Sequence, residues 1–258
     1  ALLAVFQRHL IYLSERTAEP EQLARAAALN VEPWRSANGE IIGWRRPPRP
    51  GTPAGHRLLV FHGNAGSALY RTHFIDGFES LDHGRLWHVH LFEYPGYGAR
   101  PGEPSEPTIV AAARAALLQL VRDDARPIYL LGESLGSGPA SALARDEPTH
   151  VAGVFLLTPF ARLADVAAHH YPWVMVRLIL RDRWDNMAAL RDFRGPLAVF
   201  VAERDEMIPA RQGDEIFESY AGPKRRWIQP GATHNTIDFR TGSPWWEEVS
   251  EFLLEKRL

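Results

Sequence analysis

One serine motif, set between an apolar run and a segment of small residues, constrains this chain more than any other feature. The motif is Gly132-x-Ser134-x-Gly136, preceded by the apolar residues 127–131 and followed by the small residues 139–145. Strand, sharp turn and helix around Gly-x-Ser-x-Gly form a nucleophile elbow, which holds the serine in a strained backbone conformation. Glycine is needed on both sides because a Cβ atom there would collide with the crossing strand and helix. The pattern predicts that Ser134 is a nucleophile presented at a sheet edge.

Apolar runs alternate with helical patterns along most of the chain. The expected strands cover residues 57–61, 86–92, 128–131, 152–157, 197–201 and 226–229. The expected helices cover residues 21–29, 68–81, 108–122 and 245–254, with Ser105 as the cap of the third. Asn38-Gly39, between residues 31–36 and 41–46, predicts an antiparallel hairpin at one edge. This alternation predicts an α/β fold, with a mostly parallel central sheet and helices on both faces.

Length and charge narrow the class of protein. The 258 residues fit a single α/β domain spanning residues 1–258, which needs neither a disulfide nor a metal to hold its core. The 29 Lys and Arg residues balance 31 Asp and Glu residues, so the net charge gives no indication of nucleic-acid binding. Cysteine is absent, which excludes thiol catalysis and disulfides.

The first residues, Ala1 to Phe6, are apolar and do not begin with Met. Two interpretations are open: the end of a signal or membrane anchor, or an amphipathic helix lying on the domain. The first would place a soluble catalytic domain at a membrane, and the second would leave a cytoplasmic protein. Residues 1–30 are expected to be helical in either case.

Residues 158–194 interrupt the alternation of strands and helices. An insertion at this point would cover the carboxyl ends of the strands as a small helical lid. Phe160, Tyr171 and Trp173 are candidates for binding the substrate, with packing in the core as the alternative for each.

A serine hydroxyl needs an adjacent base that is oriented by an acid. Asp205 follows the strand 197–201, and His234 follows the strand 226–229. The carboxyl ends of parallel strands share one edge of the sheet, and the order Ser, Asp, His is the one expected for such a fold. The competing acids are Glu203 and Glu206, and the competing base is the pair His169-His170 in the lid.

Acyl transfer also needs donors for the developing oxyanion. We expect the backbone amides of Leu135 and Asn64 to supply them, with His62 holding the loop that carries Asn64. This loop lacks the Gly-Lys-Ser/Thr of a phosphate-binding P-loop, and the loop 96–102 misses the dinucleotide pattern by one residue. No metal ligand is assigned.

Four motifs carry a resemblance to a known family. They are Phe61-His62-Gly63-Asn64-Ala65-Gly66, Glu93-Tyr94-Pro95-Gly96-Tyr97-Gly98, Gly132-Glu133-Ser134-Leu135-Gly136, and Asp205-x-x-Ile208-Pro209 with His234. Together they resemble the α/β-hydrolase superfamily and, more narrowly, its Bem46-like branch of serine hydrolases. The resemblance implies a Ser134–Asp205–His234 triad, an oxyanion hole at Asn64 and Leu135, and no cofactor. Phe6-Gln7 is also similar to the residues that follow the membrane helix of many members, whereas the loop 99–102 departs from the family pattern.

These observations predict a serine hydrolase that cleaves a small-molecule carboxylic ester or thioester of short or medium acyl chain. A serine aminopeptidase or amidase would use the same triad, with Asp182 or Asp185 as a candidate for binding a free amine. A non-enzymatic binding module on the same fold would tolerate the loss of a triad member, and none is lost.

Overall fold

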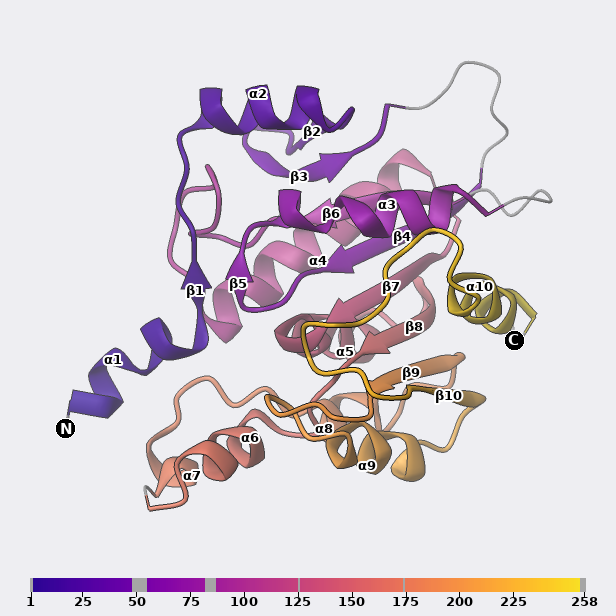
Figure 1. Cartoon of the computed structure of the whole chain (residues 1–258). Coiled ribbons are helices and arrows are strands. Elements are labelled where there is room, and N and C mark those ends of the chain that lie inside the picture. The colour runs from indigo at the N-terminus through magenta and orange to yellow at the C-terminus, as the bar shows by residue number, and fades with distance from the viewer. Residues whose placement is uncertain (1, 48–54, 82–86, 125, 174, 256–258) are drawn as a thin grey trace.

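An eight-stranded sheet forms the centre of the molecule, in the order β10-β9-β8-β7-β4-β6-β3-β2 (Figure 1). The computed structural model describes residues 2–47, 55–81, 87–124, 126–173 and 175–255, apart from the side chains of residues 2–6, 177 and 178. The strands are β2 (Glu32–Arg35), β3 (Ile41–Arg45), β4 (His56–Phe61), β6 (Trp87–Phe92), β7 (Ile128–Glu133), β8 (Val151–Leu157), β9 (Leu197–Ala202) and β10 (Lys224–Gln229). The pairs from β6 to β10 are parallel, whereas β2 and β3 form the antiparallel edge that Asn38-Gly39 predicted.

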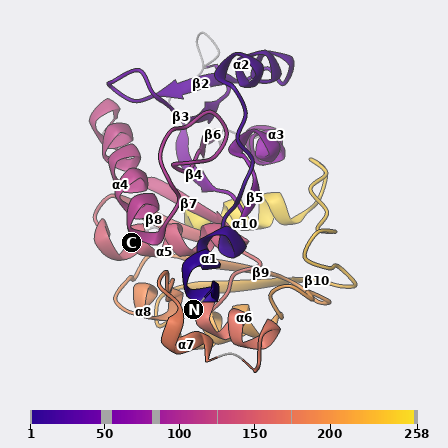
Figure 2. The same cartoon turned by 90° about the vertical axis from the view of Figure 1, so that its left-hand side faces the viewer.

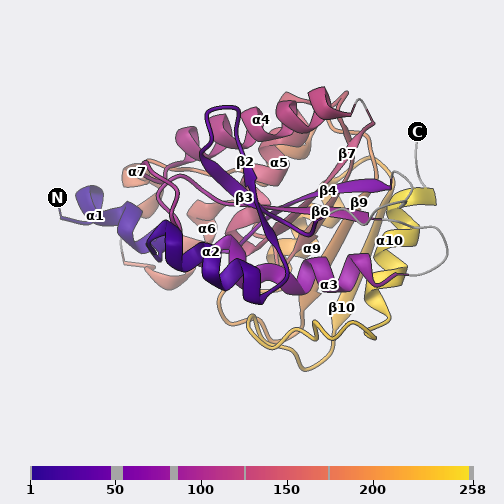
Figure 3. The same cartoon turned by 90° about the horizontal axis from the view of Figure 1, so that it is seen from above.

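Helices cover both faces of this sheet, as the sequence predicted (Figure 3). They are α1 (Leu2–Ile11), α2 (Glu19–Ala28), α3 (Thr72–Glu79), α4 (Glu106–Asp123), α5 (Ser137–Asp146), α6 (Leu163–His170), α7 (Val176–Ile179), α8 (Asn186–Leu190), α9 (Arg211–Ser219) and α10 (Trp245–Glu255). Short 3₁₀ turns η1 (Ala68–Arg71) and η2 (Ser134–Gly136) precede α3 and α5, and a small parallel pair joins β1 (Leu13–Ser14) to β5 (Ala65–Gly66).

Successive residues of the central strands enter different halves of the core. Leu59 and Phe61 of β4 pack with α4, α5, α8 and α9, whereas Leu58 and Val60 pack with α3 and α10. This division follows from the period of two along a strand, and it explains why the central strands are apolar at nearly every position. The observed strand bounds lie within two residues of the predicted ones. Position 86, predicted as the start of a strand, lies outside the described residues.

The region predicted as a lid, residues 158–194, divides into two parts. Its second part belongs to the body, because Asn186 donates from Nδ2 to Ser137 Oγ (2.9 Å) and to the carbonyl of Phe160 (2.8 Å). Trp184 is buried there beside Gly138 of α5. The first part, α6 and α7, stands at the edge of the molecule beside α1 (Figure 2). Position 174 of this region lies outside the described residues.

Ser105 caps the N-terminus of α4. Ser105 Oγ accepts a hydrogen bond from the amide of Thr108 at 3.2 Å, as the sequence predicted. Ser105→Ala should lower the free energy of unfolding by about 1 kcal/mol, because it leaves one N–H of the first turn without its acceptor. Urea denaturation measures the loss. Ser80→Ala is the matched control, since its hydroxyl donates to the Gly77 carbonyl and caps no N–H; equal losses in the two variants would contradict the assignment.

Candidate active site

The turn after β7 presents Ser134 in a conformation that few residues adopt. Its φ is +53°, in the left-handed region. The close approach of the chain around it explains both glycines of the motif. A Cβ atom on Gly136 would lie 2.1 Å from the carbonyl oxygen of Phe61, and one on Gly132 would lie 2.4 Å from that of Gly136. Only glycine fits at these two positions, so the motif fixes how the elbow crosses β4.

A continuous line of hydrogen bonds joins Ser134, His234 and Asp205. His234 Nε2 lies 3.0 Å from Ser134 Oγ, and His234 Nδ1 lies 2.7 Å from Asp205 Oδ2. The second carboxylate oxygen of Asp205 accepts from the amides of Met207 (2.9 Å) and Ile208 (2.7 Å), which fixes the orientation of the carboxylate. The Asp205 carboxylate therefore accepts hydrogen bonds on both oxygens and is held facing the imidazole.

The competing residues occupy other positions. Glu203 accepts a hydrogen bond from the amide of Gly231 at 2.7 Å, and Glu206 is exposed. His170 lies in the cavity wall with its Nε2 2.8 Å from the carbonyl oxygen of Met207, and His169 is exposed on α6. The structure thus brings together the three residues that the chain order selected.

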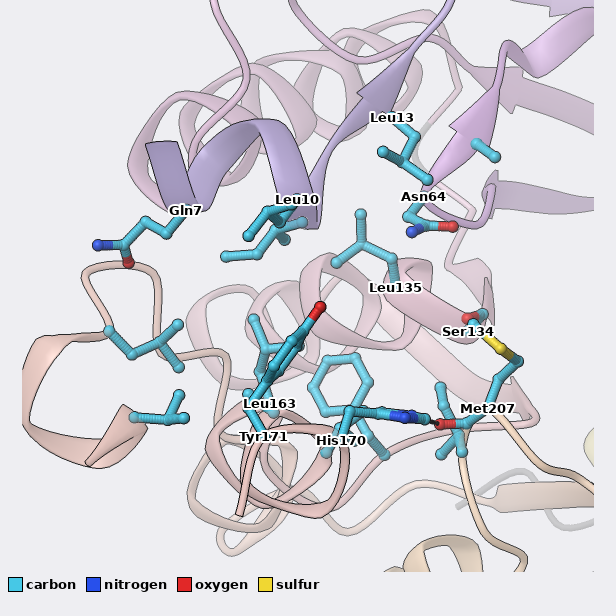
Figure 4. Close-up of a pocket in the computed structure, with 18 of the residues that line it drawn as sticks. Gln7, Leu10, Leu13, Asn64, Ser134, Leu135, Leu163, His170, Tyr171 and Met207 are labelled. Atoms are coloured by element: carbon cyan, nitrogen blue, oxygen red, sulfur yellow. Dashed lines mark hydrogen bonds between the residues drawn. The ribbon is translucent and has the colours of Figure 1, made fainter. Parts of the chain in front are cut away.

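Asn64 and Leu135, the expected oxyanion donors, both line the cavity beside Ser134 (Figure 4). The position of Asn64 is fixed from two sides, because its carbonyl oxygen accepts from the amide of Leu13 (3.0 Å) and from the hydroxyl of Tyr97 (2.8 Å). A preorganised loop is what oxyanion stabilisation requires, since the donors must not reorganise during the reaction.

The buried side chains of His62 and Glu93 lie beneath this loop. His62 is buried outside the cavity lining, with Nδ1 2.7 Å from the carbonyl oxygen of Gly63 and Nε2 3.3 Å from the carboxylate of Glu93. The same carboxylate accepts from the amide of Ala68 at 3.0 Å. The ring of Tyr94 lies over His62 at 4.1 Å, and its hydroxyl donates to the His62 carbonyl. His62 therefore contacts the loop and not Ser134.

A second charged pair, Glu133 with Arg71, was not predicted from the sequence. Arg71 Nε donates to Glu133 Oε2 at 2.5 Å, and the amide of Gly63 donates to the same oxygen at 3.3 Å. Glu133 precedes the serine of the elbow, so this carboxylate connects the elbow to the loop that carries Asn64. A charged residue inside an otherwise apolar turn was the available signal, because a covered carboxylate requires a cation or several donors.

The pKa of the Glu133 carboxyl is lowered in this setting. Burial alone would raise it, but the charge of Arg71 and its hydrogen bond, followed by His73 and His62, outweigh that effect.

An apolar cavity of about 670 Å³ opens next to Ser134 (Figure 4). Its walls come from α1 and from the pair α6 and α7, which are distant from α1 in sequence, together with residues that follow β4, β7, β8, β9 and β10. The apolar side chains that line it are Leu10, Ile11, Leu13, Ala65, Leu135, Phe160, Leu163, Val166, Ala167, Tyr171, Val176, Ile179, Leu180, Met207 and Ile208.

The three predicted pocket residues have different positions. Phe160 and Tyr171 line the cavity, whereas Trp173 is 82% exposed and does not. The prediction for Trp173 was wrong because the chain between α6 and α7 turns this side chain outwards. The contribution of α1 to the cavity wall was not foreseen.

Polar contacts hold α1 against the segment that follows α7. The side-chain amide of Gln7 donates to the Ile179 carbonyl (3.1 Å) and accepts from the Arg181 amide (2.7 Å). Arg8 forms two hydrogen bonds, of 3.0 and 3.1 Å, with the buried carboxylate of Asp182. Bidentate pairs of this kind are geometrically specific, so α1 is a built part of the cavity wall.

In the part of the chain that the structure describes, no group of three or more His, Cys, Asp or Glu side chains is arranged to hold a metal ion. None of the helices in the described ranges is both long and apolar enough to span a membrane.

The fold and this arrangement of residues define an α/β hydrolase. The family model for the alpha/beta hydrolase fold matches residues 56–194, and the chain belongs to this family. An uncharacterised protein of Mycobacterium tuberculosis is 33% identical over 96% of this chain and 88% of its own length. Protein bem46 of Schizosaccharomyces pombe is 25% identical over 77% of this chain and 67% of its own, which agrees with the Bem46-like resemblance of the motifs.

A solved structure shares the fold. The ferulic-acid complex of Est1E from Butyrivibrio proteoclasticus has a TM-score of 0.69 and 18% identity, covering 86% of this chain and 97% of that one.

The Glu133–Arg71 pair predicts a specific dependence of stability on pH. Because the pKa of Glu133 is depressed in the folded state, its ionised form stabilises the fold above the ordinary value of 4.5, and that stabilisation is lost as pH falls through the lower folded value. The difference in free energy of unfolding between the parent and Glu133→Gln should therefore be largest near neutral pH and shrink below about pH 4.5. Urea titrations from neutral to acidic pH measure it. A difference that stays constant over this range would contradict the pairing.

Proposed function

We propose that this protein is a serine hydrolase that cleaves carboxylic ester or thioester bonds through an acyl-enzyme. The observation that carries the proposal is the line of hydrogen bonds from Ser134 through His234 to Asp205, beside an apolar cavity. The family's fold supports the same class of reaction, and the residues of the site supply each role that acyl transfer needs.

In the acylation step, His234 Nε2 takes the proton of Ser134 Oγ while that oxygen bonds to the carbonyl carbon of the substrate. Asp205 accepts the Nδ1–H of His234, holds the required tautomer and stabilises the imidazolium. The carbonyl oxygen gains negative charge, which the backbone amides of Asn64 and Leu135 stabilise. The tetrahedral intermediate then collapses, His234 returns its proton to the leaving alcohol or thiol, and the acyl group remains on Ser134.

Deacylation repeats these roles with water as the nucleophile. His234 takes a proton from water, the hydroxyl oxygen bonds to the acyl carbon, and the same two amides stabilise the oxyanion. Release of the carboxylic acid returns the proton to Ser134 Oγ. No group beyond these residues is needed in either step.

The cavity suggests the acyl part of the substrate. Its lining is mostly aliphatic, and apolar walls with few polar groups are typical of sites that bind hydrocarbon. Ser134 lies at one end and Gln7 at the other (Figure 4), so an acyl chain bound at Ser134 would run between α1 and α6. We propose short or medium acyl chains, whose length is limited where α1 meets α7.

An aminopeptidase or amidase remains the alternative, and the two acids considered for it are already occupied. Asp182 is buried and paired with Arg8, and Asp185 accepts from the Ala188 amide at the start of α8. A free amine would need an unpaired carboxylate near Ser134, so this geometry favours ester substrates.

The direct test is hydrolysis of p-nitrophenyl esters from acetate to palmitate, with Ser134→Ala assayed beside the parent. We expect turnover by the parent and a loss on the order of a millionfold in the variant, because the nucleophile, base and acid act as one unit. No turnover of any ester by the parent, or equal turnover by the variant, would contradict the proposal. Peptide p-nitroanilides, assayed in parallel, test the alternative.

The acyl pocket gives a separate prediction. Leu163 lines the middle of the cavity, between Ser134 and Gln7 (Figure 4). Leu163→Trp should lower kcat/KM for long esters while leaving acetate nearly unchanged, because the larger ring would fill the path of the chain beyond the first few carbons. The ratio of kcat/KM for octanoate to that for acetate measures the effect. Ile228→Trp, at an exposed position away from the cavity, is the control, and an unchanged ratio in Leu163→Trp would place the acyl chain elsewhere.

A further inference from the structure

Exposed apolar side chains gather around the mouth of the cavity. In the described part of the chain, the large apolar side chains that are exposed lie there with the exception of Leu29 and Ile228. We call this surface the mouth patch; its residues are Leu10, Leu13, Tyr171, Trp173, Met175, Ile179 and Met207. Five of them also line the cavity, and Trp173 and Met175 lie on the connection between the lining residues Tyr171 and Val176.

The outermost side chains of this patch are the least covered. Trp173 is 82% exposed and Met175 is 74% exposed. Scattered exposed leucines are ordinary in soluble proteins, but a contiguous apolar surface rimmed by polar groups marks a place of interaction.

The mouth patch is presented by a fixed scaffold. Gln7 and Arg8 of α1 bind the chain at residues 179–182, as described above, and Trp184 donates from Nε1 to the hydroxyl of Tyr12 at 3.1 Å. Because α1 and the segment after α6 are held together in this way, apolar residues that are far apart in sequence form one surface.

Exposed basic side chains lie beside the mouth patch on α1 and on the segment that follows α7. His9, Arg181 and Arg183 are exposed on the same two segments. Residues 171–183 contain one acidic residue, Asp182, and its carboxylate is buried and paired with Arg8. An exposed acid, Glu206, lies on the opposite side of the mouth, next to Met207. The surface therefore combines aromatic and Met side chains with arginines, which suits an anionic partner that has an apolar interior.

We infer that the mouth patch docks on the surface of an anionic phospholipid bilayer. Trp and Tyr side chains favour the boundary between hydrocarbon and water, and basic residues near an anionic leaflet contribute about 1 kcal/mol each. Trp173 and Met175 insert where the lipid headgroups meet the acyl chains, and Arg181 and Arg183 contact the lipid phosphates.

A bilayer fits this surface better than a protein partner because five residues of the patch also line the cavity. A protein covering it would close the route to Ser134, whereas a bilayer would deliver acyl chains directly to that route. This last argument rests on the proposed ester hydrolysis; the patch, its scaffold and its charge do not.

The test is binding to vesicles of phosphatidylcholine alone and of phosphatidylcholine with phosphatidylserine, measured by co-sedimentation. We expect binding to the anionic vesicles. Trp173→Ala should weaken it about tenfold or more, because the variant lacks the aromatic side chain that the bilayer would bury. Arg181→Ala and Arg183→Ala should each weaken it about fivefold. Ile228→Ala is the matched control, since it removes an exposed apolar side chain elsewhere.

Tryptophan fluorescence gives a readout specific to the patch. The emission should shift to shorter wavelength on vesicle binding, and the shift should be absent in Trp173→Phe, which retains an apolar ring. Circular dichroism checks that each variant is folded. Vesicle binding is also measured with Ser134→Ala, so that a failure of docking can be distinguished from a failure of hydrolysis.

Two results would overturn the inference. One is the absence of binding to anionic vesicles, or equal binding by the parent and Trp173→Ala. The other is a dimer in sedimentation that Trp173→Ala converts to a monomer, together with no vesicle binding, which would assign the patch to a second copy of this chain.

Discussion

The site depends on how closely the elbow approaches β4. With a Cβ atom at Gly136, the chain would overlap the carbonyl of Phe61, and the turn could not place Ser134 at a φ of +53° above the sheet. This single approach also brings the amide of Leu135 and the loop after Phe61 to the same point in space. The proposed nucleophile and both proposed oxyanion donors thus share one steric constraint, and the parallel strands bring Asp205 and His234 to the same edge.

Buried charges connect the parts that this constraint brings together. Glu133 connects the elbow to Gly63 and Arg71. Glu93 holds the start of η1 by accepting a hydrogen bond from the amide of Ala68. Each carboxylate is stabilised by several donors or a cation, which is the condition under which a covered charge can be tolerated. At the outer edge, the Arg8–Asp182 pair performs the same task for α1, and so an apolar cavity is enclosed by segments with polar attachments.

Local sequence patterns were sufficient where the physical signal is local. Apolar runs predicted the strands, Ser105 predicted the cap of α4, and the order of Ser134, Asp205 and His234 predicted that they would meet. Ser134 and His234 are 100 positions apart, but both follow strands of one parallel sheet, and this common edge made their contact predictable. The side-chain contacts of Glu133 with Arg71 and of Gln7 with Ile179 have no such framework, and the sequence did not predict them. The outward direction of Trp173 was missed for a different reason, since residue type does not decide which side of a connecting loop faces solvent.

The measurement that tests the central claim most directly is labelling with a fluorophosphonate, followed by mass spectrometry of the intact chain and of its fragments. An activated serine attacks phosphorus and remains bound to it, whereas an ordinary serine does not react. The proposed chemistry predicts one adduct per chain, carried by the fragment that contains Ser134, and strongly slowed labelling in His234→Ala. No adduct on the folded protein, or an adduct on a different serine, would contradict the assignment of Ser134, His234 and Asp205 as the catalytic residues.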